Sequence, residues 1–87
     1  MNVSAAFVGG AYAFVQKEGR LLYTGSCADD CASWRPFPGA LGSAGVGDWT
    51  IDRQADAPQW LYRGKSVFVA QGPDVTDMPT GAAVLRP

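Results

Sequence analysis

The sequence predicts a mainly β protein, a single small domain over residues 1–87 that is built from antiparallel hairpins. Three observations lead to this fold class. The 11 glycines and 6 prolines interrupt the long periodic segments that helices need. The segments rich in aromatic and β-branched residues are short and bounded by turn residues. Hydrophobic residues make up 47% of the chain, which is enough for a folded core and argues against disorder.

The first hairpin is expected near residues 11–24. Residues 11–16 (AYAFVQ) and 21–24 (LLYT) consist mostly of side chains that favour strands. The segment between them, KEGR, is polar, and Gly19 can supply a turn position with positive φ.

A three-stranded meander is expected near residues 48–70. Trp49 and Ile51 alternate with polar neighbours, which is the period of a strand with one buried face. A loop ending at Pro58 leads to a second strand over 59–63. The pair Gly64-Lys65 then predicts a tight turn into a third strand over 66–70.

The remaining segments are expected to be mostly irregular. The glycine- and proline-rich stretch 36–47 predicts a surface loop, and residues 82–85 predict a short edge strand. One short helical turn is expected near 28–34, ending before Pro36 because the residue preceding proline avoids the α region.

Charge and composition argue against several classes of function. The net charge is −1 and the seven basic residues are dispersed, whereas a nucleic-acid-binding protein usually carries a basic stripe. No apolar run approaches the roughly 18 residues of a transmembrane helix, and residues 1–15 lack the basic start of a signal peptide. Without histidine or a nucleophile motif, we expect no catalytic residues, no cofactor and no metal site, so that the chain is not an enzyme.

Cys27 and Cys31, the only cysteines, leave three alternatives open: a structural disulfide, redox-active thiols or a Cu(I) site. The spacing of four does not match the thioredoxin-like motif of two cysteines separated by two residues. The intervening Asp29 and Asp30 would raise the pKa of a thiolate, and two thiols without histidine cannot complete a zinc site. These points favour the structural disulfide, and thiol–disulfide redox activity is the enzymatic alternative.

Three tryptophans and a neighbouring tyrosine form the second set of candidate residues: Trp34, Trp49, Trp60 and Tyr62. Such large rings usually fill the core of a small domain. The functional alternative is an exposed aromatic surface that binds a carbohydrate or a peptide.

Three separated segments resemble a bacterial secreted-repeat, or predicted lipoprotein, family of unknown function. They are CADDCASWRPF at 27–37, GDWTIDR at 47–53 and QWLYRGK at 59–65. The resemblance runs over 19–87, although the insert usual before the first cysteine is missing here. It implies export to the periplasm or the cell exterior, and such an oxidising compartment would favour a Cys27–Cys31 disulfide.

Together these points predict a small extracytoplasmic, non-catalytic module with a binding or structural role in the cell envelope. Its partner is an unidentified protein or small ligand. An envelope redox or Cu(I)-handling protein that uses the cysteine pair is the alternative function, and a cytoplasmic location is left open.

Overall fold

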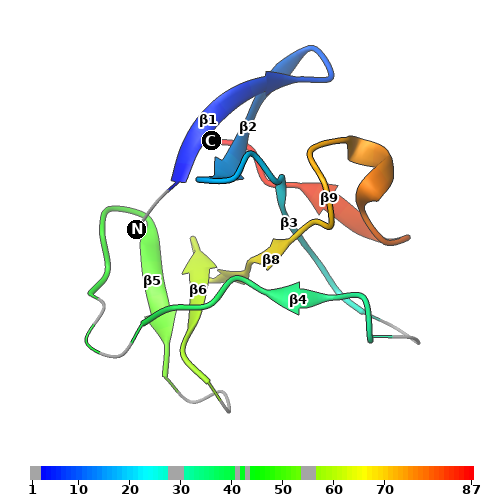
Figure 1. Ribbon diagram of the computed structural model, residues 1–87. Helices are drawn as coiled ribbons and strands as arrows, with labels where there is room; N and C mark the ends of the chain where they lie inside the picture. Colours follow the sequence, from blue (N-terminus) through cyan, green and yellow to red (C-terminus); the bar gives the residue numbers. More distant parts are fainter. Residues whose placement is uncertain (1–2, 28–30, 41, 43, 54–56) are drawn as a thin grey trace.

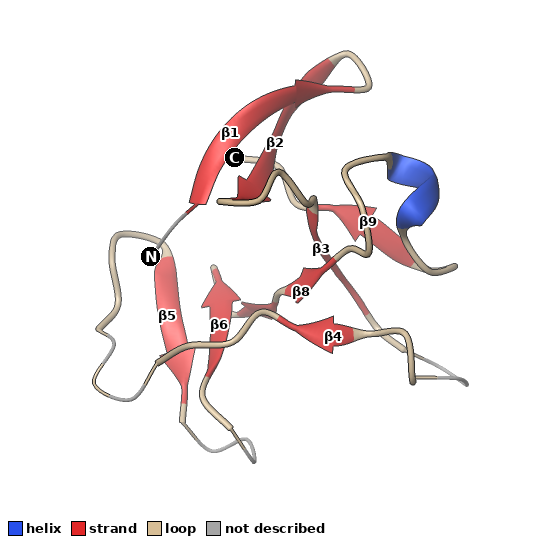
Figure 2. Ribbon diagram, in the orientation of Figure 1, coloured by secondary structure: helices blue, strands red, loops and turns tan. Residues whose placement is uncertain are grey.

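The mainly β, antiparallel prediction is confirmed by a computed structural model, which describes residues 3–27, 31–40, 42, 44–53 and 57–87 (Figures 1 and 2). In chain order, the elements are β1 (Val3–Val8), β2 (Ala11–Gln16), β3 (Leu22–Gly25), β4 (Arg35–Pro36), β5 (Trp49–Asp52), β6 (Gln59–Tyr62), β7 (Lys65–Ser66), β8 (Phe68–Val69), the 3-10 turn η1 (Val75–Asp77) and β9 (Ala82–Val84). No helix in these described ranges is long and apolar enough to cross a membrane.

Within the described residues, the strands form three antiparallel sheets, in the orders β1-β2, β4-β8-β3-β9 and β5-β6-β7. Strand β3 is central, because it pairs with β8 along one edge and with β9 along the other. The short strand predicted at 82–85 is β9, and it lies at the edge of this sheet as expected.

The predicted strands at 11–16 and 21–24 are present as β2 and β3, but their main partners differ from the expected ones. The turn between them is confirmed, since Gln16 N–H donates to the Arg20 carbonyl at 3.0 Å. Direct pairing is limited to one bridge between Val15 and Leu21. Beyond it, β2 pairs along its whole length with β1, and β3 turns to β8 and β9.

Strand β1 was not expected from the sequence. It pairs with β2 in a register that sets Val8 opposite Ala11, so the connecting turn is the pair Gly9-Gly10. Both glycines have positive φ, 62° and 86°, as the primed hairpin turns require. Gly-Gly between two apolar runs is the sequence signal that could have identified this hairpin.

The meander is confirmed in its first two strands and corrected in its third. The turn after β6 is Arg63-Gly64 rather than Gly64-Lys65, and Arg63 has a positive φ of 49°. The third strand, expected over 66–70, changes sheet at the fully buried Val67. Val67 N–H donates to the Trp60 carbonyl, while its own carbonyl accepts from Phe37 N–H.

The helical turn expected near 28–34 is not seen in the described part of that segment. Residues 28–30 lie outside the described residues, and 31–34 form one turn in which Trp34 N–H donates to the Cys31 carbonyl. The 3-10 turn of the described chain is η1, which Asp74 and Asp77 cap reciprocally. The described part of 36–47 is mostly irregular, as predicted, apart from β4 at its start and two isolated bridges.

Two hydrophobic clusters lie on opposite faces of the strands. Cluster 1 contains the buried side chains of Ala13, Val15, Leu21, Tyr23, Trp34 and Ala70. Cluster 2 contains those of Leu22, Trp49, Trp60, Tyr62, Val67 and Leu85. Consecutive residues of β3 and its flank alternate between the clusters, as the two-residue period of a strand requires.

The C-terminal segment joins the β1–β2 hairpin to the four-stranded sheet that contains β3. Leu85 N–H donates to the Leu22 carbonyl, and the Leu85 carbonyl accepts from Phe14 N–H, both at 2.9 Å. The Arg86 guanidinium then donates to the carbonyls of Val8, Ala11 and Tyr12 through a single nitrogen, Nη1. Segments from both ends of the chain are therefore held side by side (Figure 1).

We predict that Leu22→Ala lowers the free energy of unfolding by about 2–5 kcal/mol, because it leaves a cavity at a fully buried position. This is a large share of the about 5–15 kcal/mol that stabilises a typical domain. The matched control is Val75→Ala in η1, at a position that is 42% exposed, which should change stability by no more than about 0.5 kcal/mol. Urea unfolding of both variants measures the difference, and equal losses would contradict the two-cluster description.

Candidate functional site

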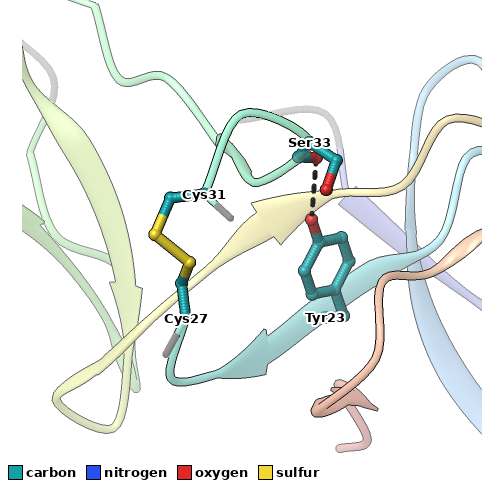
Figure 3. Close-up of a disulfide and its surroundings, with 4 residues drawn as sticks. All are labelled: Tyr23, Cys27, Cys31 and Ser33. Atoms are coloured by element: carbon teal, nitrogen blue, oxygen red, sulfur yellow. Dashed lines mark hydrogen bonds between the residues drawn. A yellow bond between two sulfur atoms is a disulfide. The ribbon is translucent and has the colours of Figure 1, made fainter. Parts of the chain in front are cut away.

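The two cysteines meet in the loop between β3 and β4 (Figure 3). The Sγ atoms of Cys27 and Cys31 are 1.98 Å apart, which is disulfide distance, and their Cα atoms are 5.7 Å apart. Cys27 is half-buried against cluster 1, whereas Cys31 is exposed. Asp29 and Asp30, which we expected to disfavour a thiolate, lie outside the described residues.

The chain leaving the loop returns onto β3 through backbone contacts. Trp34 N–H donates to the Cys31 carbonyl at 3.1 Å. The Tyr23 hydroxyl, which points from β3 toward the loop, donates a long hydrogen bond of 3.5 Å to the Ser33 carbonyl (Figure 3). The disulfide loop is therefore connected to the central strand at both of its ends.

Three aromatic rings pack beneath this loop. Trp34 makes edge contacts with Tyr23 and Phe68, at centroid distances of 5.3 and 5.0 Å. Tyr23 and Phe68 are stacked at 5.5 Å. A methyl group in place of the Gly25 hydrogen would lie 3.1 Å from the Trp34 ring and 2.7 Å from the Gly81 carbonyl, so only glycine fits there.

Tyr23 is a structural phenol and not a group that exchanges protons near neutral pH. Burial raises its pKa above the ordinary value of 10.0, and a hydrogen bond with the Arg35 backbone lowers it by a smaller amount. The side chain stays neutral throughout the physiological range, which suits its place in an apolar cluster.

The predicted aromatic binding surface is not present. Trp34, Trp49, Trp60 and Tyr62 are only 5–8% exposed, because each ring packs into one of the two clusters. Trp49 is central to cluster 2, with its ring 4.9 Å from that of Tyr62 and 6.2 Å from that of Trp60. The core alternative is the one that the structure supports for all four side chains.

The exposed aromatic residues are instead Phe7 and Tyr12, which the sequence analysis did not select. They are 67% and 60% exposed and make an edge contact at 5.4 Å across the β1–β2 hairpin. Locating this hairpin from Gly9-Gly10 would have placed the two rings opposite one another near its turn.

A surface hollow of about 420 Å³ adjoins the start of the disulfide loop. Its lining residues are Thr24, Gly25, Ser26, Lys65, Ser66 and Ala83. Three hydroxyl groups and one ammonium group can donate hydrogen bonds to an oxygen-bearing ligand.

Among the described residues, no group of three or more histidine, cysteine or acidic side chains is arranged to hold a metal ion.

Comparisons with protein-family models, curated proteins and solved structures found no match to this chain.

We predict that replacing both cysteines with serine lowers the free energy of unfolding by about 2 kcal/mol, the value expected for opening a five-residue loop. Denaturant unfolding measures the change. Adding reductant to the unmodified protein should reproduce this loss and should leave the serine variant unaffected. A serine variant as stable as the oxidised protein would show that the loop bond stabilises nothing.

Tyr23 should also make the fold sensitive to alkali. Its folded pKa is raised, so the unfolded chain loses the proton first as the pH rises above about 10, and stability then declines until the folded pKa is passed. Tyr23→Phe has no phenol to ionise, so this loss of stability should be absent from the variant. The free energy of unfolding should therefore fall less for Tyr23→Phe than for the unmodified protein between about pH 9 and about pH 12. If the free energy of unfolding depends on pH in the same way in both proteins, the raised pKa of Tyr23 in the folded state would be contradicted.

Proposed function

We propose that this protein is a small extracytoplasmic, non-catalytic module with a binding or structural role in a cell envelope. The observation that carries the proposal is the Cys27–Cys31 pair at disulfide distance. Disulfides persist in oxidising compartments and are rare in reducing ones. The motif resemblance to exported proteins described above favours the same location.

The position of the pair favours a structural role for the bond. Cys27 packs against cluster 1, and the loop leads directly to Trp34, which lies in that cluster. The disulfide thus restricts the segment that fills the space beside β3 and β8. Thr24 and Ser26, which line the surface hollow, directly precede this restricted loop. We expect a small oxygen-bearing ligand to bind in that hollow.

The test is the redox state of the thiols in protein taken from the cell that makes it. We expect that alkylation under denaturing, non-reducing conditions adds no label by mass spectrometry, because both sulfurs are bonded. The same sample reduced first should gain two labels, which serves as the control. Two freely alkylated thiols in the unreduced sample would overturn the proposal.

Redox or Cu(I) handling by the same pair is the second candidate, favoured by the exposure of Cys31. The reduction potential distinguishes the two functions, since structural disulfides usually lie below about −300 mV and labile ones above. A potential below that value, with no Cu(I) bound by the reduced protein, would exclude this second function.

A further inference from the structure

We propose that the outer edge of β1 is a self-association site, at which a second copy of this chain adds its own β1 in antiparallel orientation. The product is a continuous four-stranded sheet in the order β2-β1-β1-β2, with the two-fold axis between the β1 strands. The inference concerns a surface that includes neither the disulfide loop nor the surface hollow beside it, and it is independent of the proposed compartment.

The outer edge of β1 is open in the described part of the chain, because its sheet contains β1 and β2 alone (Figure 1). Soluble proteins usually protect such edges by shortness, charge, proline or a bulge. β1 has none of these protections: it is six residues long, its sequence is VSAAFV, and it pairs with β2 without interruption.

The other edge strands are protected. β4 is two residues long and contains Pro36, and β7 is two residues long and contains Lys65. β5 carries Asp52, and β9 is limited to three residues. β2, the other strand of the hairpin, is as long as β1 and also lacks charge and proline, but its outer edge is occupied: Phe14 N–H donates to the Leu85 carbonyl, and Val15 forms a bridge with Leu21. Among the described strands, β1 is thus the long, uncharged, proline-free strand whose outer edge is open.

The hairpin turn determines which backbone groups of β1 point outward. A two-residue loop closes on a hydrogen-bonded pair, here Val8 and Ala11. Hydrogen-bonded pairs recur at every second residue, so residues 4, 6 and 8 bond to β2. The N–H and C=O groups of Val3, Ala5 and Phe7 therefore face the open edge.

These outward groups match those of a second copy in one symmetric register. With Ala5 opposite its own counterpart, Val3 lies opposite the second copy's Phe7, and every outward N–H meets an outward carbonyl. Facing side chains also lie on the same face of the sheet, as antiparallel pairing requires. The two small alanine side chains at the two-fold axis fit beside each other on one face of the sheet.

The side chains give a second reason for choosing a copy of this chain as the partner. Phe7, which is 67% exposed, would gain a cross-strand contact with a valine on the same face. The edge carries no charge that would select a partner of opposite sign. A two-fold interface uses the same patch twice, and β1 satisfies this condition with its own sequence.

Cysteine cross-linking tests the register. In Ala5→Cys, the two sulfurs would face each other across a hydrogen-bonded pair with Cα atoms about 5.5 Å apart, within the range of a disulfide. In the matched control Ser4→Cys, the equivalent Cα atoms would be about 8 Å apart, which is too far for a disulfide. After mild oxidation and peptide mapping, we expect the cross-linked fraction to be at least about tenfold larger for Ala5→Cys.

Sedimentation equilibrium tests the association itself. The mean mass should rise from the chain's 9.2 kDa toward twice that value as concentration increases. Ala5→Pro should remain monomeric while keeping native circular dichroism, because it removes an N–H that points away from β2. If this variant does not fold, the cysteine pair still decides the question.

Four results would overturn the proposal. The first is a monomer at millimolar concentration together with no cross-link in Ala5→Cys. The second is a dimer that a folded Ala5→Pro leaves intact, and the third is equal cross-linking of the two cysteine variants. A dimer in which neither variant cross-links would place the interface elsewhere and would also reject β1.

Discussion

The structure depends on a central strand that is buried on both of its faces. Leu21 and Tyr23 point into cluster 1, while Leu22 between them points into cluster 2. The same alternation recurs from Val67 to Ala70 on and around β8, the neighbour of β3. A shift of one residue in either strand would exchange its two sets of side chains, so both clusters specify one register.

This arrangement addresses the small size of the chain. A domain of 87 residues buries a smaller fraction of its surface than a large one, and a single-faced sheet would leave half of its strand residues in water. Placing apolar groups on both faces lets short strands serve two clusters. Aromatic rings fill much of that space, and most of their contacts are edge-on, the geometry that aromatic quadrupoles favour.

The sequence predicted the strands better than their partners. Residues 11–16, 49–52 and 59–62 were found because their composition or period is that of a strand. Pairing could not be derived, because strands buried on both faces have apolar residues at successive positions and no distinct outer face. β1 was missed for another reason: its apolar sequence near the N-terminus resembles part of an export signal as much as a strand.

The candidate site was predictable to a similar degree. Spacing and the absence of histidine identified the cysteine pair as a structural candidate, but the Tyr23 and Ser33 contacts depend on how the loop folds back. The number of aromatic residues could not show which rings are exposed. Trp49 and Trp60 project from β5 and β6 into cluster 2, whereas Phe7 and Tyr12 lie near the turn of a hairpin that extends beyond the clusters.

The attachment of that hairpin connects the core to the surface. Its inner half is anchored by Ala13 and Val15 in cluster 1. Near its turn, Arg86 donates three hydrogen bonds to backbone carbonyls of both strands. Because β1 is already fixed in this way, the conformational-entropy cost of adding a strand to its edge is smaller, since only the incoming segment needs ordering. When the incoming segment is the equally fixed β1 of a second copy, little ordering remains on either side, so even a short ladder can hold two molecules together.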